Sequence, residues 1–297
     1  MLSRLPSGII LGVLAGCVFF PAVLSAQSFS LTPGKLEAEV APGAQLEREI
    51  AITNTLGRDT TFKIEFEDVE PGGVGEGVKL LGNKTSKNSL KNYFLTPEQF
   101  VSVRQGATVR VPISIILPQA VFPGSLHGAV FVSPVVDDIS GGPQAVPRLG
   151  ILTLVRVIGD RIEVGKLQEV SVWPPLAIGY SNPQLRLRFE NTGNTYLNPY
   201  GLVTVTNFIS QTKITLPIKP WFVLPQSTRE HQIKLPVLSS GIYQIRLDLN
   251  RGYNNQIDVV QKYMIVMPWW VVGFIVLLSF GGLWWMGWRV FKTRMVY

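Results

Sequence analysis

Cysteine, histidine and charge are all scarce in this sequence. Its 297 residues include one cysteine, Cys17, and two histidines. One thiol cannot form an intramolecular disulfide, and two histidines without a second thiol cannot build the usual zinc sites, so we predict no metal site and no cofactor. Charged residues make up 16% of the chain, against roughly a quarter in an average soluble domain. Because 46% of the residues are hydrophobic, the composition excludes a disordered chain and argues against a plain cytosolic enzyme.

Motifs of catalysis are missing as well. The sequence contains no G-x-S-x-G turn, no H-E-x-x-H helix and no phosphate-binding loop, and neither His127 nor His231 has a nucleophile in such a motif. The densest acidic cluster consists of Glu65, Glu67, Asp68 and Glu70. Its first two members fall on the polar side of an alternating strand, which favours a solvated face over a carboxylate pair or a calcium site. We therefore predict no catalytic residues, although triads form in space and an envelope hydrolase stays open as the weakest alternative.

Residues 1–26 are typical of a secretory signal peptide. Arg4 is followed by an apolar stretch, residues 8–24, and then by two small residues. A rival interpretation is lipoprotein processing at Cys17, because the sequence Leu-Ala-Gly precedes that cysteine. Three apolar residues directly follow Cys17, where a polar tether is expected, so ordinary cleavage is favoured and lipidation remains the minority alternative.

The other end of the chain predicts a transmembrane helix over residues 263–288. Residues 269–288 carry no charge, and as a helix they span about 30 Å, the thickness of a bilayer core. Tryptophans that suit the two membrane interfaces flank this stretch: Trp269, Trp270, Trp284, Trp285 and Trp288. The basic residues of the tail, 289–297, are Arg289, Lys292 and Arg294. An excess of Lys and Arg marks the cytoplasmic side, so we predict a single-pass protein of the cell membrane with residues 27–262 outside the cytoplasm.

Between the two ends, residues 27–262 read as short strands separated by turns. Apolar and polar residues alternate in several segments: 46–52, 62–66, 109–115, 185–189 and 243–249. Pro112 predicts an edge or bulged position in its strand. Asn-Thr turns begin at Asn54 and Asn191, each between two such strands. This repetition predicts two antiparallel β-sandwiches, in residues 27–163 and 164–262.

The motifs of residues 30–160 resemble those of a known domain. They are a Pro-Gly turn and an Asn-Thr turn within residues 36–54, the run 89–94 ahead of Phe100, and a strand and hairpin in residues 105–130. In this order they look like the N-terminal Ig-like domain of bacterial WxL-interacting surface proteins. The layout of signal peptide, two Ig-like domains, membrane helix and basic tail is also similar. The resemblance implies that the first domain binds peptidoglycan and that the second binds a partner protein.

Two aromatic residues follow a long polar loop, residues 71–92, of the kind that often carries binding. Tyr93 and Phe94 stand where the family usually has a tryptophan, and their rings could stack on sugars. The alternative, that they begin a strand and pack on the core, is equally favoured. They are the candidate binding residues of this sequence.

Together these patterns predict an all-β fold, two tandem Ig-like antiparallel β-sandwiches followed by one transmembrane helix, that binds cell-wall polymer or another envelope protein. An alternative is an envelope-assembly chaperone of the pilus type, which offers an edge strand to a subunit, although a soluble chaperone needs no membrane anchor. The two ends hold four cations and no acid, so the net charge of +7 falls to +3 (23 minus 20) between them. So modest a charge is a poor footprint for nucleic acid, which we do not expect as a partner.

Overall fold

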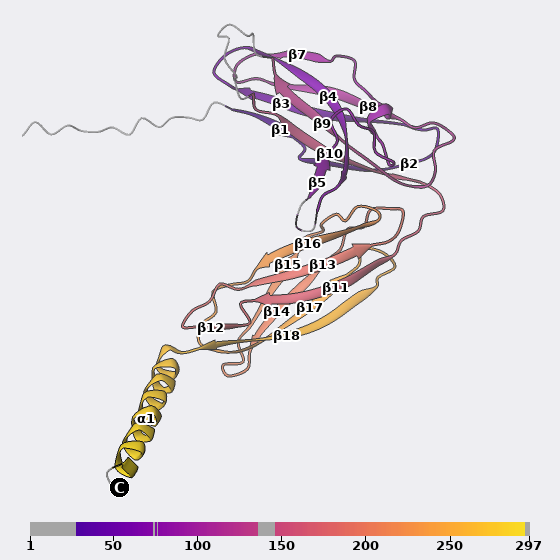
Figure 1. Ribbon diagram of the computed structural model, residues 1–297. Coiled ribbons are helices and arrows are strands. Elements are labelled where there is room, and N and C mark those ends of the chain that lie inside the picture. Colours follow the sequence, from indigo (N-terminus) through magenta and orange to yellow (C-terminus); the bar gives the residue numbers. More distant parts are fainter. Residues whose placement is uncertain (1–27, 74, 76, 136–145, 295–297) are drawn as a thin grey trace, which may run out of the picture.

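The computed structural model of the protein describes residues 28–73, 75, 77–135 and 146–294. Two β-sandwiches follow one another along the chain, and a single long helix extends from the end of the second (Figure 1). The predicted fold class, two tandem Ig-like sandwiches and a C-terminal helix, is confirmed. The predicted signal peptide, residues 1–26 with Cys17, lies outside the described residues.

The first sandwich contains ten described strands and one short 3-10 turn. In chain order they are β1 (Ser28–Thr32), β2 (Lys35–Val40), β3 (Gln45–Thr55), β4 (Thr60–Pro71), β5 (Val78–Leu80), η1 (Lys91–Tyr93), β6 (Phe94–Leu95), β7 (Phe100–Val103), β8 (Thr108–Ile116), β9 (Gly124–Pro134) and β10 (Leu149–Val157). One sheet has the order β1-β3-β8-β6 and the other the order β2-β10-β9-β4-β5, with β7 also paired to β4.

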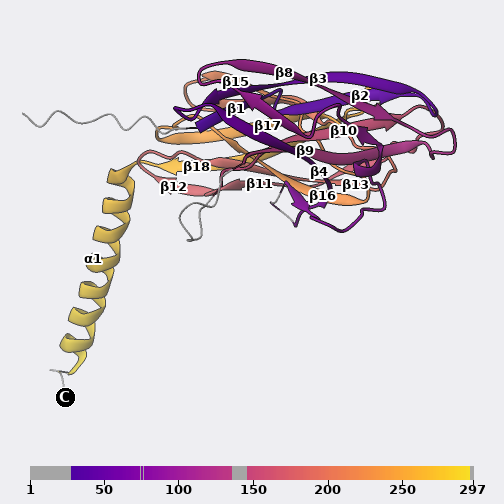
Figure 2. The ribbon, with the colours of Figure 1, turned by 90° about the horizontal axis from the view of Figure 1, so that it is seen from above.

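The second sandwich contains eight strands. They are β11 (Gly165–Trp173), β12 (Leu176–Ile178), β13 (Gln184–Asn191), β14 (Tyr200–Asn207), β15 (Lys213–Ile218), β16 (Ser227–Lys234), β17 (Gly241–Asn250) and β18 (Ile257–Met267). They form a three-stranded sheet, β11-β13-β16, and a five-stranded sheet, β12-β18-β17-β14-β15. Figure 2 shows the strands of both sandwiches from above.

The two sandwiches repeat one topology. In each, the chain leaves one sheet after its first strand, passes a proline (Pro33 or Pro174), and joins the other sheet as its second strand. That second strand lies parallel to the last strand of the sandwich, β2 beside β10 and β12 beside β18, whereas the other pairs of named strands are antiparallel. One sheet of each sandwich is therefore mixed at one edge, because its second and last strands run in the same direction there.

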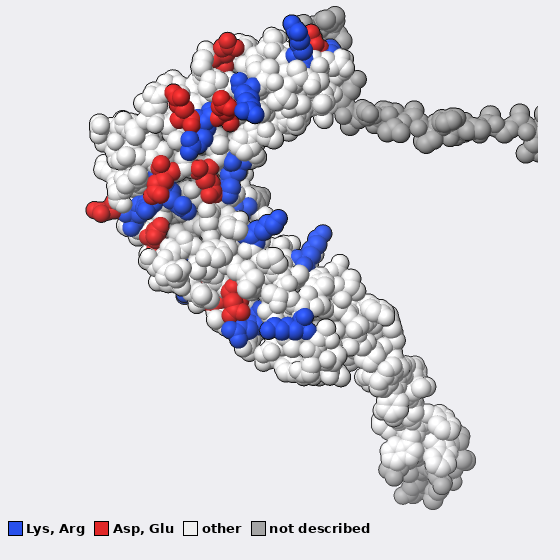
Figure 3. All heavy atoms as spheres, turned by 180° about the vertical axis from the view of Figure 1, so that it is seen from behind, with Lys and Arg blue, Asp and Glu red and all other residues white. Residues whose placement is uncertain are grey.

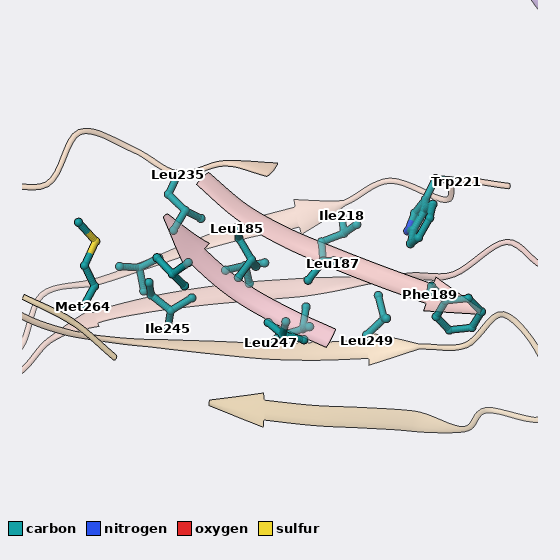
Figure 4. Close-up of a cluster of buried hydrophobic side chains, with 14 of the residues drawn as sticks. Leu185, Leu187, Phe189, Ile218, Trp221, Leu235, Ile245, Leu247, Leu249 and Met264 are labelled. Carbon is teal, nitrogen blue, oxygen red and sulfur yellow. The ribbon is translucent and has the colours of Figure 1, made fainter. Parts of the chain in front are cut away.

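The cores confirm the alternating strands predicted from the sequence. In the first sandwich Ile50 and Ile52 of β3 pack with Phe62 and Ile64 of β4, and each is at most 1% exposed. The second core is drawn in Figure 4, where inward-facing residues of β13 and β17 meet between the two sheets. Because alternate side chains of a strand point to opposite faces, a period of two in the sequence is enough to place these residues inside.

Pro112 lies in a part of β8 that has a strand on one side only among the described residues. It pairs with Glu49 of β3, and on the other side β6 reaches only Ser114 and Ile115. The local edge position predicted from the missing N–H of proline is therefore confirmed.

The helix begins and ends later than predicted, since it also includes residues 289–294 of the predicted tail. Residues 263–267 continue β18, paired with β17 and β12, and α1 runs over Trp269–Arg294 after Pro268. The prediction of a helix from residue 263 was wrong because the apolar run 263–267 serves the sandwich as an alternating strand, with Met264 and Val266 buried in its core. Residues 269–286 of α1 have a mean hydropathy of 1.7 and are long enough to cross a membrane, and none of them is buried inside the protein.

Candidate functional site: the cleft at the junction of the sandwiches

The junction between the sandwiches is built around Ser125 at the start of β9. Its backbone N–H donates to the carbonyl oxygen of Asn194 (2.9 Å), and its hydroxyl accepts the N–H of Tyr196 (2.6 Å) and lies 2.9 Å from the hydroxyl of Thr195. The side chain of Asn194 donates to the carbonyl of Pro123 and accepts the N–H of Ile162 in the linker between β10 and β11. One turn of the second sandwich is thus hydrogen-bonded to a strand of the first.

Tyr196 adds an apolar contact to these hydrogen bonds. Its side chain is 1% exposed and packs with Leu154 of β10 and Leu224 of the second sandwich. The guanidinium of Arg156 stacks over its ring at 4.0 Å. Burial raises the pKa of Tyr196 to about 12. Because residues of both sandwiches exclude water from this ring, the junction is a packed contact as well as a linker.

A cleft with a volume of about 840 Å³ opens beside the junction. Its lining comes from the end of β4, the loop before η1, the β8–β9 connection with the start of β9, and two turns of the second sandwich: Glu70, Pro71, Ser86, Lys87, Asn88, Ser89, Tyr93, residues 120–127, Asn194, Pro225 and Gln226. Both sandwiches therefore form its walls. The volume lies within the range of about 300–1,000 Å³ that is usual for ligand pockets.

Asp68 holds one wall of the cleft in place. Its carboxylate is fully buried and accepts the backbone N–H groups of Ser86 (3.1 Å), Leu90 (3.1 Å) and Lys91 (3.0 Å). Backbone hydrogen bonds of this kind stabilise a buried carboxylate and fix the loop that donates them. Asp68 belongs to the acidic cluster predicted to be a solvated face, and for this member the prediction was wrong.

The other members of that cluster lie at the surface or at the cleft. Glu65, whose side chain is 35% exposed, pairs with Lys63 (2.8 Å), and Glu67, whose side chain is only 14% exposed, pairs with Arg148 (2.6 Å). A hydrogen bond from Lys63 is the main cause that lowers the pKa of Glu65. Glu70 lines the cleft. Among the described residues no group of three or more His, Cys, Asp or Glu side chains is placed to hold a metal ion.

Two buried polar atoms of the cleft lining have no hydrogen-bond partner among the residues that the structure describes. These atoms are Ser89 Oγ and His127 Nδ1. The two residues pair in a short parallel β-bridge, and the backbone N–H of His127 donates to the carbonyl oxygen of Asn88 (2.9 Å). His127 is 2% exposed, and burial lowers its pKa to about 4, against a smaller opposing attraction from Asp68. The imidazole is therefore neutral at pH 7. Buried polar atoms are normally paired, so these two atoms keep unused hydrogen-bonding capacity just beneath the surface of the cleft.

The two aromatic residues predicted to bind ligand occupy different environments. Tyr93 lines the cleft and is half-buried. Phe94 is 5% exposed, and its ring stacks on that of Phe66 with centroids 4.7 Å apart, which matches the alternative of core packing. A third ring, not singled out in the sequence, is the most exposed of the three: Phe122 at the mouth of the cleft is 87% exposed. Binding of a ligand by Tyr93 or Phe94 remains a prediction.

The remaining predicted residues lie far from the cleft, on α1. The tryptophans at its start, Trp269 and Trp270, are exposed, as are Trp284, Trp285 and Trp288 near its other end. Arg289, Lys292 and Arg294 belong to its last turns. Their predicted roles in anchoring and orientation remain predictions.

The sequence did not assign a role to His127 and Phe122, which line the cleft, or to Asp68, which holds one of its walls. The alternation of β4 gives a weak signal for Asp68. Glu65 and Glu67 are two positions apart and share one face of the strand, whereas Asp68 falls on the opposite face. The sequence gives no corresponding signal for Phe122, because only the approach of the second sandwich makes its loop part of a cleft.

Solved structures with a similar fold include fimbrial chaperones. The class 5 fimbriae chaperone CfaA aligns over 80% of this chain and 99% of its own, with 10% identity and a TM-score of 0.40. The E. coli chaperone DraB aligns over 79% and 98%, with 14% identity and a TM-score of 0.38, and the Pseudomonas aeruginosa chaperone CupB2 over 79% and 100%, with 10% identity and a TM-score of 0.38. No family model and no curated protein matches the sequence. Identities and TM-scores this low assign no function to the chain.

The resemblance to WxL-interacting proteins is matched in its architecture. Two Ig-like sandwiches and one apolar C-terminal helix are present. The features specific to that family, peptidoglycan binding by the first domain and partner binding by the second, remain predictions.

Proposed function

We propose that the chain is a membrane-anchored, extracytoplasmic binding protein that holds a segment of another envelope protein in the cleft between its two sandwiches. The observation that carries the proposal is the lining of this cleft, in which Ser89 Oγ and His127 Nδ1 are buried without partners beside the rings of Tyr93 and Phe122. The chain acts by binding and not by catalysis.

A polypeptide segment suits this lining. The peptide backbone carries one donor and one acceptor per residue, which can pair with the hydroxyl of Ser89 and the ring nitrogen of His127 once a movement of the lining exposes these two buried atoms. Phe122 and the prolines of the lining offer apolar surface to side chains. Lys87 and Glu70 are the charged residues of the lining, so the site carries no strong field of one sign. Peptidoglycan, whose sugars also suit aromatic rings, is the competing ligand.

Anchoring by α1 is supported by its composition and exposure. Residues 269–288 carry no charge, residues 269–286 are not buried against the protein, and the basic tail follows. A helix of this length and hydropathy in water would expose a large apolar surface, which a bilayer covers. By the positive-inside rule the tail lies in the cytoplasm and the sandwiches outside it.

Cross-linking in intact envelopes tests the binding site. A photoreactive amino acid replaces Phe122 in the full chain, and the matched control replaces Leu202, which is 47% exposed on β14 and does not line the cleft. We expect Phe122 to cross-link to a discrete envelope protein and Leu202 to give no such product. Equal patterns at both positions, or cross-linking of Phe122 to glycan strands only, would contradict the proposal, and the second result would favour wall binding.

The free edge of β10 favours a second candidate, an assembly chaperone of the pilus type. The neighbouring strand β2 pairs with residues 152–157 of β10 and leaves residues 149–151 without a described strand on that side. An extended segment of another protein could add to this edge by β-augmentation. Leu149, which is 37% exposed, is the position for a second photoreactive probe. Cross-links from Leu149 to an unassembled subunit, with none from Phe122, would favour this candidate over the cleft.

A further inference from the structure

The end of the second sandwich from which α1 emerges has no charged residues. Four segments meet there: residues 173–183, 205–212, 235–245 and 263–288. None of them contains Asp, Glu, Lys or Arg, so all the charged residues of the second sandwich lie outside them. In Figure 3 the charged side chains gather over the first sandwich and the adjoining half of the second, and the end next to the helix is white on this face.

Backbone contacts bring the four segments together. The N–H of Gly179 donates to the carbonyl of Met267 (2.7 Å), and the N–H of Phe208 donates to the carbonyl of Ile242 (2.8 Å). Ser181 pairs with Leu238 in an isolated bridge. These contacts join loops from both sheets to the strand that leads into α1. The uncharged residues therefore form one continuous end of the sandwich and are not scattered over its surface.

Large apolar side chains point outward from this end. Trp173 is 62% exposed, Tyr180 76%, Ile209 74% and Val237 66%. Single exposed apolar residues are ordinary, but a continuous group of them on an uncharged surface marks a contact surface. We refer to this surface, formed by the exposed residues of segments 173–183, 205–212 and 235–245, as the helix-proximal face.

Basic residues border the helix-proximal face. Where a charged residue of the sandwich directly adjoins one of the four segments, it is basic: Lys213, Lys234, Arg246 and Lys262. Arg246 pairs with Asp248 (2.9 Å), whereas the three lysines are exposed. Apolar rings and side chains bordered by lysines are the pattern of a surface that enters the interfacial layer of a bilayer, where the ammonium groups reach the phosphates of the lipids.

The start of α1 is packed against this same end. Gly179 has a φ of +75°, in the left-handed region, and a Cβ atom added there would overlap the indole of Trp269. The first residue of the helix therefore contacts a loop of the helix-proximal face. If Trp269 lies at the membrane interface, the helix-proximal face beside it lies at the same depth in the membrane.

We propose that the helix-proximal face rests in the interfacial layer of the bilayer that α1 crosses, as a second membrane contact that sets the orientation of the two sandwiches. The inference rests on the proposed function, since it requires α1 to span the membrane. The continuity of the face with α1 and the lysine border identify lipid as the occupant. The cleft, at the opposite end of the second sandwich, is then held at a fixed distance from the membrane surface.

Fluorescence in vesicles tests the contact. The full chain, with its only cysteine removed by Cys17→Ser, carries Ile209→Cys labelled with an environment-sensitive fluorophore. Its matched control carries Ile257→Cys, which is 59% exposed at the other end of the second sandwich. Both are reconstituted into vesicles of phosphatidylcholine and phosphatidylglycerol with spin-labelled lipids. We expect a blue-shifted emission and a severalfold stronger quenching at position 209 than at position 257.

The outcomes separate the inference from the proposed function. Equal, weak quenching at both positions, in protein that floats with the vesicles and resists alkaline extraction, would overturn the membrane contact and leave the anchor intact. Protein that fails to float would overturn the anchor and with it the inference. A blue shift at position 209 without quenching by lipid would assign the face to a second copy of the chain, against the proposal. As a further variant, Ile209→Asp with Val237→Asp should abolish quenching of a label at Tyr180→Cys while flotation is unchanged.

Discussion

The first and second sandwiches follow one topology and close the same turn with the same residue. Asn54 and Asn191 are both fully buried at the end of a strand, and each side-chain amide donates to two backbone carbonyls, one four residues ahead and one in a distant segment. The sandwiches differ in what is added to this frame. The first has a long loop held by Asp68 and forms most of the cleft, whereas the second has the uncharged end from which α1 emerges. The shared turns carry the fold, and the unshared ends carry the proposed contacts.

Separating the two sandwiches is expected to have the largest effect. Tyr196→Ala removes a buried ring from the junction, and we expect it to lower the free energy of unfolding by about 3–5 kcal/mol. It should also turn one denaturation transition into two, because the sandwiches then unfold independently. Chemical denaturation followed by fluorescence measures both effects, with Tyr200→Ala, at a half-exposed position outside the junction, as the control. A single, unshifted transition would contradict this account of the junction.

Breaking the shared turn tests whether the two frames are equivalent. Asn54→Ala and Asn191→Ala each leave two carbonyl groups without their donor, and we expect each to lower the free energy of unfolding by about 2–3 kcal/mol. Denaturation curves of the two variants should shift by similar amounts, while Asn182→Ala, at an exposed position, should shift little. A large loss of stability in one variant and a negligible loss in the other would show that the two sandwiches share a topology but not the stabilising role of this asparagine.

Asp68 should matter to the first sandwich alone. Asp68→Asn replaces one acceptor oxygen by an NH₂ group, so part of the set of three backbone N–H groups loses its partner, and we expect a loss of about 2 kcal/mol. Hydrogen exchange of residues 86–91 should become faster, whereas the second sandwich should be unaffected. Glu67→Gln, which removes an ion pair at the surface, is the matched control. Unchanged exchange in Asp68→Asn would refute its role as the anchor of the loop.

Acid should also lower the stability of the two sandwiches by different amounts, and this is the smallest effect that we expect. The pKa of His127 is lowered to about 4 by burial, below its ordinary value of about 6.5, so the unfolded chain binds the proton more readily. Stability is therefore complete above pH 6.5 and is lost as the pH falls toward 4, by about 1.5 kcal/mol at pH 5.5. His231, stacked on Trp221 in the second sandwich, has a pKa lowered first by burial and then by Arg229, so its effect has the same sign.

Stability measured against pH in His127→Gln and His231→Gln tests that difference. We expect the slope between pH 6.5 and 5 to flatten more in His127→Gln, because His127 is 2% exposed and His231 is only half-buried. A slope that is unchanged in His127→Gln would refute the assignment of this acid sensitivity to the first sandwich.

Much of the fold could be predicted because its signals are local. The alternation around Ile50 and Phe62, the turns at Asn54 and Asn191 and the uncharged run that became α1 are each visible within a few residues of sequence. The boundary between β18 and α1 was less certain, since an apolar run such as residues 263–267 suits a buried strand and the start of a membrane helix equally well. Length and hydropathy cannot separate the two where a strand runs directly into a helix.

The sequence by itself therefore determined the two sandwiches, their order and the apolar helix, because periodicity and composition act over neighbouring residues. Only the tertiary structure decided the candidate site. Asp68 meets Leu90 across 22 positions, and Ser125 meets Tyr196 across 71, contacts that leave no periodic trace in the chain. The same holds for the helix-proximal face, whose loops come from both sheets. Such sites depend on which ends of the strands come together, and that is set by packing over the whole sandwich and not by any one segment.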